Sequence, residues 1–198
     1  MLEWITAISG LVLVLVTLMG YIAKKELKYV FWLISGISFL VIGLALAIMG
    51  LNDALAFPGT IYLGSIYPSF LAIGILFDKE EKWGRYYLIF TLIMLVLIGA
   101  GQATGTVLKT IAQVTLHATS GLIIVFLPLL YYFKGELHED YLFFSIGGIV
   151  IGIGGLALAT LIAGKPLLPF DLVVMLLHPL LFISAFLIAL SVYLVQQL

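Results

Sequence analysis

The chain has 198 residues, of which 64% are hydrophobic and only 10% are charged, and its mean hydropathy is +1.27. In soluble domains roughly a quarter of all residues are charged. This composition therefore excludes a water-soluble globular protein and predicts a multi-pass protein of the cell membrane. The net charge of −1 argues against a nucleic-acid partner, and the absence of cysteine excludes disulfides, thiolate metal sites and a cysteine nucleophile.

Seven apolar runs follow one another along the chain, each close to the roughly 20 residues that cross a bilayer as a helix. Short polar breaks separate the runs, and none of these breaks is long enough to fold alone. The sequence therefore predicts an all-α fold of seven transmembrane helices in one membrane domain, residues 1–198. The runs cover about residues 4–23, 29–50, 60–77, 86–106, 110–133, 141–163 and 172–195.

Basic residues are divided unevenly between the breaks. The first, third and fifth breaks hold seven Lys and Arg residues, whereas the second, fourth and sixth hold two, Lys109 and Lys165. Because basic loops stay in the cytoplasm, the N-terminus is predicted to lie outside and the C-terminus inside. One of the basic breaks, DKEEKWGR at 78–85, is predicted to be a solvated cytoplasmic turn.

The second half of the chain resembles the first at a nearly constant spacing. Residues 6–16, TAISGLVLVLV, align with residues 117–127, HATSGLIIVFL. Four such matches occur in the same order, and together they indicate an ancestral duplication. The other three are KKEL at 24–27 with KGEL at 134–137, GLALA at 43–47 with GLALA at 155–159, and Pro58 and Pro68 with Pro169 and Pro179.

The duplication predicts a 3+1+3 arrangement of the seven helices. The first repeat covers about 4–77, a connector helix about 86–106, and the second repeat about 110–195. An odd number of spans precedes the second copy, so both copies have the same orientation. Parallel repeats of this kind recur in transporters, including the sugar carriers called SWEETs, and the likeness to that family is one of topology only.

The segment at 57–77, FPGTIYLGSIYPSFLAIGILF, combines a Pro-Gly turn with Tyr, Gly, Tyr-Pro and a Gly-containing helix end. It resembles an uncharacterised family of small prokaryotic multi-pass membrane proteins, over about a tenth of the chain. The resemblance implies a fold and no reaction. No Ser-His-Asp arrangement, pair of catalytic carboxylates or phosphate-binding loop occurs, so no residue is predicted to be catalytic.

Two histidines lie inside predicted membrane helices. His117 and His178 each come seven residues after the start of their helix, which places both rings roughly 10 Å below the outer boundary at 1.5 Å per residue. Their counterparts in the first repeat are Thr6 and Tyr67. The sequence therefore predicts a functional centre in the outer half of the second repeat.

Three interpretations of this centre remain open. In the first, each ring hydrogen-bonds to a neighbouring helix and stabilises the bundle, and Gln113 is a local partner for His117. In the second, both rings ligate one metal, most plausibly the iron of a b-type haem, which takes axial imidazoles from facing helices. Ser120 and Gly121 would then offer a small face to the flat ligand, and Lys109 and Lys165 would meet its propionates.

In the third interpretation, the histidines belong to a proton or small-solute path through the membrane. Ionisable groups inside a membrane mark such paths. Asp171 lies two helical turns before His178, on the same face of the helix. The predicted path includes Thr6, Tyr67, His117, Asp171 and His178, and its ligand would be a small molecule.

Overall fold

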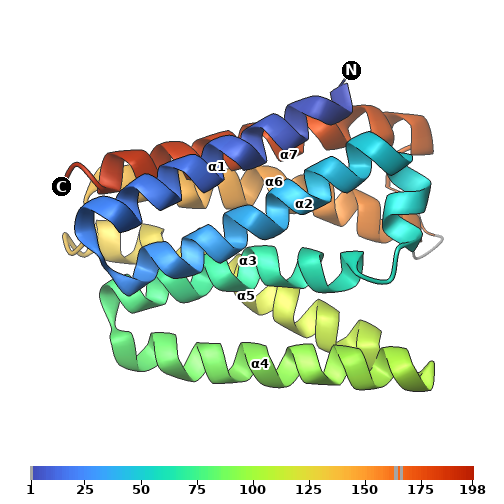
Figure 1. Cartoon of the computed structure of the whole chain (residues 1–198), viewed down its shortest axis with the longest axis horizontal. Helices are drawn as coiled ribbons and strands as arrows, with labels where there is room; N and C mark the ends of the chain where they lie inside the picture. The colour runs from blue at the N-terminus through green and yellow to red at the C-terminus, as the bar shows by residue number, and fades with distance from the viewer. Residues whose placement is uncertain (1, 163–164, 166) are drawn as a thin grey trace.

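The computed structural model describes residues 2–162, 165 and 167–198. In these residues the structure is a bundle of long α-helices without a β-strand (Figure 1). All seven helices are long and apolar enough to cross a membrane, which confirms the predicted all-α, seven-span fold. They are α1 (Leu2–Lys24), α2 (Leu27–Ala56), α3 (Thr60–Lys79), α4 (Glu81–Thr104), α5 (Leu108–Phe133), α6 (Leu142–Ile162) and α7 (Phe170–Val195), with a 3₁₀ turn η1 (Glu139–Tyr141) before α6.

Two helices extend well beyond the predicted runs, while the others differ from them by one or two residues at an end. α2 continues to Ala56 across a bend at Gly50, whose φ of +77° is a left-handed conformation that glycine adopts without strain. α4 begins directly after Glu80, so most of the predicted loop at 78–85 is helical. The last residue of the predicted sixth run, 163, lies outside the described residues.

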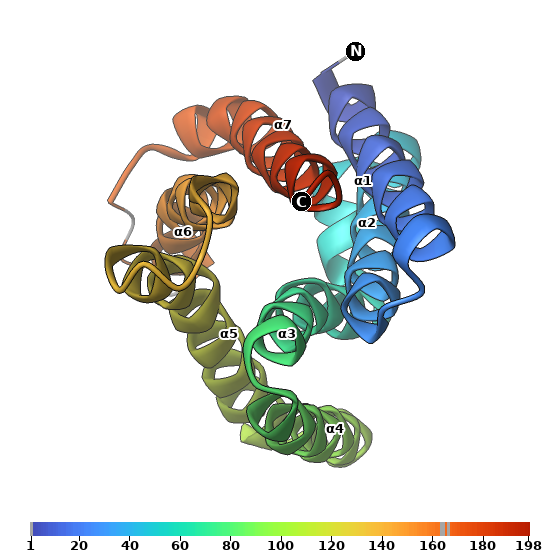
Figure 2. The ribbon, with the colours of Figure 1, turned by 90° about the vertical axis from the view of Figure 1, so that its left-hand side faces the viewer.

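Six of the helices form a closed ring. α1 contacts α2 and α7, α2 contacts α3, α3 contacts α5, α5 contacts α6, and α6 contacts α7. Figure 2 shows this ring along the bundle, with α4 lying outside it. In the described part of the chain α4 contacts only α3 and α5, so it is a peripheral helix.

The interior of the ring is a packed aromatic core and not a pore. The ring centroids of Trp32 from α2 and Phe144 from α6 lie 5.2 Å apart, and those of Phe39 from α2 and Tyr67 from α3 lie 4.6 Å apart. All four side chains are buried. This core joins the first three helices to α6 across the centre of the ring.

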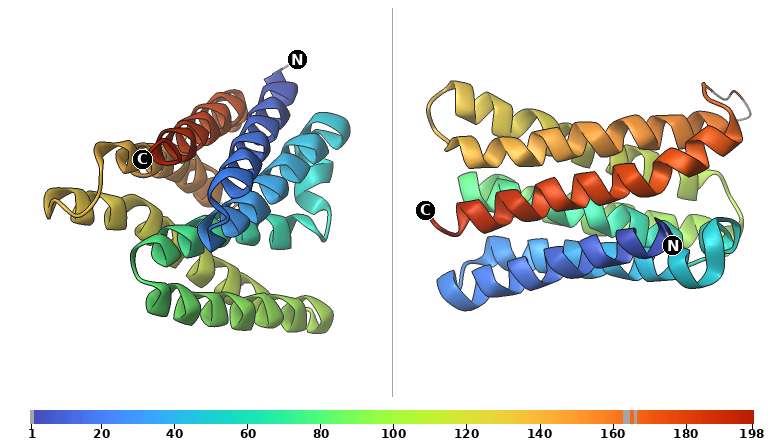
Figure 3. Two further views of the ribbon diagram at one scale, coloured as in Figure 1. Left: turned by 60° about the vertical axis from the view of Figure 1, so that its left-hand side comes forward. Right: turned by 90° about the horizontal axis from the view of Figure 1, so that it is seen from above.

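Small residues bring α1 and α2 into backbone contact. A Cβ atom added to Gly43 of α2 would lie 2.8 Å from the Cα of Ala7, and one added to Gly10 of α1 would lie 2.7 Å from the Cα of Leu40. Glycines at such positions let membrane helices approach closely. The view from above in Figure 3 shows α1 lying along α2 on one side and α7 on the other.

The helices run in alternating directions, so α1, α3, α5 and α7 all end at one end of the bundle, here called the Asp78 end. The beginning of α1 and the end of α7 consequently lie at opposite ends of the bundle (Figure 1). The three more basic breaks of the sequence all fall at the Asp78 end. That this end faces the cytoplasm stays a prediction.

Candidate functional site

His178 contacts the first helix of the chain. Its side chain, on α7, is only 7% exposed, and its Nδ1 lies 3.1 Å from the Oγ1 of Thr6 on α1. The two atoms are separated by 172 positions in the sequence. Two residues of the predicted path therefore meet at the contact between α1 and α7.

His117 faces a different neighbour. Its side chain on α5 is exposed on the side of the bundle, and its ring approaches the backbone of Gly64 on α3. Gly64 lies three residues before Tyr67, the predicted repeat counterpart of His178. His117 thus lies at the contact between α3 and α5, as His178 lies at the contact between α1 and α7.

The structure does not bring the two histidines together. No Cα atom of α5 lies within 8 Å of a Cα atom of α7 in the described parts of these helices, and the rings turn toward α3 and α1. Two imidazoles on one iron need ligating nitrogens about 4 Å apart, with roughly 2 Å to the metal on each side. The haem hypothesis stays a prediction, and it requires an arrangement of α5 and α7 other than the one described.

The residues predicted to support a haem have other surroundings. The Ser120 hydroxyl donates to the carbonyl of Leu116 at 2.6 Å and lies 2.8 Å from the hydroxyl of Tyr87 on α4. A Cβ added to Gly121 would meet no atom within 4 Å. Of the remaining predicted residues, Gln113 and Lys109 are half-buried and Lys165 and Asp171 are exposed.

The haem hypothesis has a direct spectroscopic test. If His117 and His178 are axial ligands, the protein purified with added haem should show a Soret band that shifts on reduction with dithionite. Replacing either His117 or His178 by alanine should abolish the band. His138→Ala should leave it, because His138 lies at the Asp78 end, where its Nδ1 is 2.7 Å from Asp140. A colourless protein would contradict the hypothesis.

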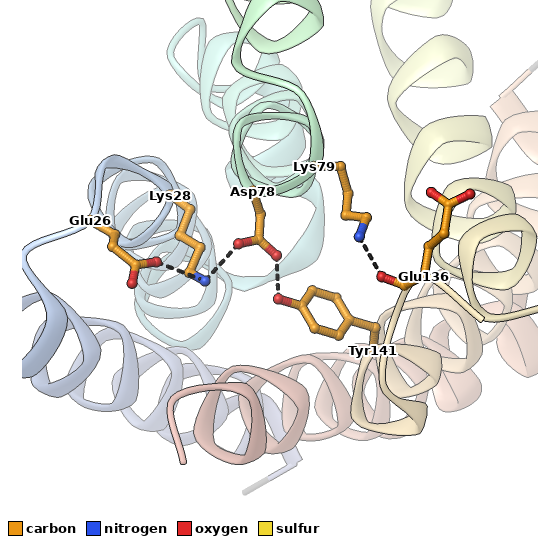
Figure 4. A network of polar contacts seen from close by, with 6 residues as sticks. All are labelled: Glu26, Lys28, Asp78, Lys79, Glu136 and Tyr141. Carbon is orange, nitrogen blue, oxygen red and sulfur yellow. Dashed lines mark hydrogen bonds and ion pairs between the residues drawn. The ribbon is translucent and has the colours of Figure 1, made fainter. Parts of the chain in front are cut away.

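A second polar cluster, which the sequence analysis missed, lies at the Asp78 end inside the ring. The Lys28 ammonium on α2 donates to one carboxylate oxygen of Asp78 on α3 at 2.6 Å. The Tyr141 hydroxyl at the end of η1 donates to the other oxygen. Figure 4 shows the Asp78 carboxylate between these two partners. The cluster therefore joins α2 and α3 to the segment that begins α6.

The charges of this cluster are largely withdrawn from solvent. The side chains of Lys28 and Asp78 are 11% and 13% exposed. Lys28 also lies 2.8 Å from the carboxylate of Glu26, which is more exposed. A pocket of about 290 Å³ lies beside the pair, and it is lined by Glu26, Leu27, Lys28, Phe77, Asp78 and Glu81. The Asp78 carboxylate is therefore buried on its inner side and close to water on the other.

The same end carries a second link between the two halves of the chain. The Lys79 ammonium on α3 donates to the backbone carbonyl of Glu136, which follows α5, at 2.6 Å (Figure 4). Neighbouring residues of α3 thus point in different directions, Asp78 into the ring and Lys79 outward toward α5. A helix places consecutive side chains about 100° apart, which allows one helix end to contact both η1 and the chain after α5.

Deeper in the ring, the Tyr67 hydroxyl is buried and makes no hydrogen bond with the described residues. It lies near Ser184 of α7, whose own hydroxyl donates to the carbonyl of Gly147 on α6 at 2.8 Å. Buried hydroxyls without a partner are uncommon in folded proteins. Tyr67, the first-repeat member of the predicted path, therefore presents a polar atom to the ring interior between α3 and α7.

The described residues contain no group of three His, Asp or Glu side chains placed to hold a metal ion. The polar sites that they do contain include the Thr6–His178 contact, the Tyr67 hydroxyl and the Asp78 cluster. No protein-family model, no curated protein and no solved structure matches this chain.

Proposed function

We propose that the protein is a transporter that moves a small polar solute through the six-helix ring, coupled to protons at Asp78. The observation that carries this proposal is the Asp78 cluster, which places a carboxylate and an ammonium inside the ring between the first three helices and the last three. Charged groups within membrane segments are costly and mark substrate or proton paths.

The contact pattern of the ring supports two equivalent halves. Exchanging α1 with α5, α2 with α6 and α3 with α7 converts every helix contact of the ring into another contact of the ring. This is the pattern expected of the proposed parallel repeat. The halves then meet at two seams, α1 with α7 and α3 with α5, and each seam contains one of the two histidines.

The polar groups follow one another along the ring. On α7, Ser184 lies six residues beyond His178, which is about 9 Å further toward the Asp78 end. On α3, Asp78 lies about 16 Å beyond Tyr67 in the same direction. Between these levels Trp32 and Phe144 fill the interior. In the described conformation the route is therefore closed twice, first by this aromatic pair and then by the Asp78 cluster.

The proposed proton coupling acts through the Asp78 carboxylate. Protonation of the Asp78 carboxylate removes the charge that binds Lys28 and weakens the acceptor of the Tyr141 hydroxyl. Three other titratable groups lie near the Asp78 carboxylate: Glu26, Tyr29 and Glu81. Of these, Glu26 also binds Lys28. In the proposed mechanism one proton weakens the Tyr141–Asp78 contact, which links the two halves at this end.

The test is proton flux into vesicles. The full chain is reconstituted into liposomes that contain the dye pyranine, and the outside is acidified in the presence of a mixture of common sugars and amino acids. Wild-type vesicles should acidify well above protein-free vesicles. Asp78→Asn should lower the initial rate by about a hundredfold, the lower end of the range for loss of a group that transfers a proton.

Glu81→Gln is the matched control, because Glu81 lines the same pocket but pairs with Arg85 outside the ring. Its flux should equal that of the wild type. A wild-type rate no higher than that of protein-free vesicles would refute the transport proposal. Equal rates for Asp78→Asn and wild type would refute the role of Asp78.

A further inference from the structure

A cleft opens on the outside of the ring where α4 leaves its neighbours. At the far end α4 and α5 are in backbone contact, because a Cβ added to Gly101 would lie 2.2 Å from the backbone nitrogen of Lys109. Toward the Asp78 end the two helices diverge, as Figure 1 shows. The resulting cleft has a volume of about 420 Å³, and its lining includes Trp83, Tyr87, Phe90, Ile123, Leu127 and Tyr131.

The cleft is large enough for part of a lipid acyl chain. It lies near the ends of its helices, at the depth expected for a membrane interface. Its lining is apolar and aromatic, and Trp and Tyr at helix ends mark the headgroup level. Tyr131 lies near the end of α5, and Ile123 lies eight residues before it, about 12 Å deeper in the bilayer. A chain that entered between α4 and α5 would lie against α3 at the base of the cleft, where Leu76 contributes to the lining.

Charged groups of both signs surround the mouth of the cleft. The ammonium groups of Lys79 and Lys134 lie 5.1 and 5.5 Å from the centre of the Tyr131 ring. The carboxylates of Glu80 and Glu136 both lie near Tyr131, and that of Glu80 is beside its hydroxyl. Two ammonium groups suit a phosphate, and a carboxylate suits a primary ammonium that can donate hydrogen bonds to it. The rim thus complements a headgroup that contains both charges.

We propose that this cleft binds one phosphatidylethanolamine molecule, with an acyl chain between α4 and α5. Its phosphate lies between Lys79 and Lys134, and its ammonium group donates to Glu80. Phosphatidylcholine has the same charges but no N–H to donate, and phosphatidylglycerol has no cation. The site is outside the ring and does not depend on the proposed transport function.

Native mass spectrometry of the detergent-purified full chain tests the proposal, with the three phospholipids added at equal concentration and with identical acyl chains. Wild-type protein should retain one phosphatidylethanolamine about tenfold more tightly than either competitor, as expected from one charge-assisted hydrogen bond. The variant Lys79→Ala/Lys134→Ala should lose affinity for all three lipids. Glu80→Gln should lose the preference for phosphatidylethanolamine.

Lys24→Ala/Lys25→Ala is the matched control, because Lys25 lies 5.1 Å from the ring of Tyr21 at the same end but outside the cleft. Its lipid binding should equal that of the wild type. A melting curve of each variant checks its folding, and Leu127→Trp, which fills the cleft, should reduce retention of all lipids. Equal or tighter binding of phosphatidylglycerol, or full retention in Lys79→Ala/Lys134→Ala, would overturn the proposal.

Discussion

Asp78→Leu is expected to lower the free energy of unfolding by about 3 kcal/mol, because it leaves the Lys28 ammonium buried without its main partner. The expected loss is at the lower end for a buried ion pair, since Glu26 still contacts Lys28 and is about half exposed. The loss of the Tyr141 acceptor adds to it. Unfolding in mixed micelles with increasing SDS, followed by tryptophan fluorescence, measures the change, because Trp32 lies in the core.

A double variant separates the charge effect from a packing effect. Lys28→Met/Asp78→Leu removes both charges, so it should be more stable than Asp78→Leu alone. The exposed pair Arg85 and Glu81 serves as a reference, with side chains 69% and 56% exposed; Glu81→Ala should cost less than about 1 kcal/mol. If Asp78→Leu cost no more than this reference, the cluster would not hold the ring together.

Gly43→Val is expected to destabilise the protein by about 3 kcal/mol, at the upper end of the usual range for overpacking. The added Cβ would lie 2.8 Å from the Cα and backbone nitrogen of Ala7, and backbone atoms cannot turn aside as a side chain can. The same Cβ would lie 3.0 Å from the carbonyl carbon of Thr6. α1 must therefore move away from α2, and the contact of Thr6 with His178 should weaken.

Gly121→Ala is the comparison for this variant, because a Cβ at that position meets no atom within 4 Å. Its free energy of unfolding should stay unchanged or rise by up to about 1 kcal/mol, since alanine favours a helix over glycine. The same SDS titration measures both. A Gly43→Val protein as stable as Gly121→Ala would show that α1 and α2 are not in close contact.

The positions of the seven helices could be predicted from the sequence, but the side-chain contacts between them could not. Hydropathy locates the seven spans because the bilayer imposes length and apolarity on each helix separately. The depths of the histidines follow in the same way from helix rise. The direction in which each ring points depends on how helices rotate and pack against distant neighbours, so neither Thr6 for His178 nor Gly64 for His117 could be derived.

Asp78 was missed for a related reason. A charged residue directly after an apolar run resembles the start of a solvated loop, and only the neighbouring α2 and η1 make it buried. One signal was present in the sequence: Lys28 directly precedes the second run and Asp78 directly follows the third, so the two charges lie at the same depth. Equal depth, which pairs the two histidines, pairs these two charges as well.

The contact between α1 and α7 has a consequence for how the protein is made. α1 and α7 are neighbours although the other helices lie between them in the chain, and the ring cannot close until α7 has been synthesised. Until then Thr6 and the open face of α1 lie against lipid. Ring closure also brings together parts of the chain that are far apart, which makes it slow. Nascent chains that lack α7 are therefore expected targets for membrane quality control, because Thr6 and the ring interior remain uncovered on that side.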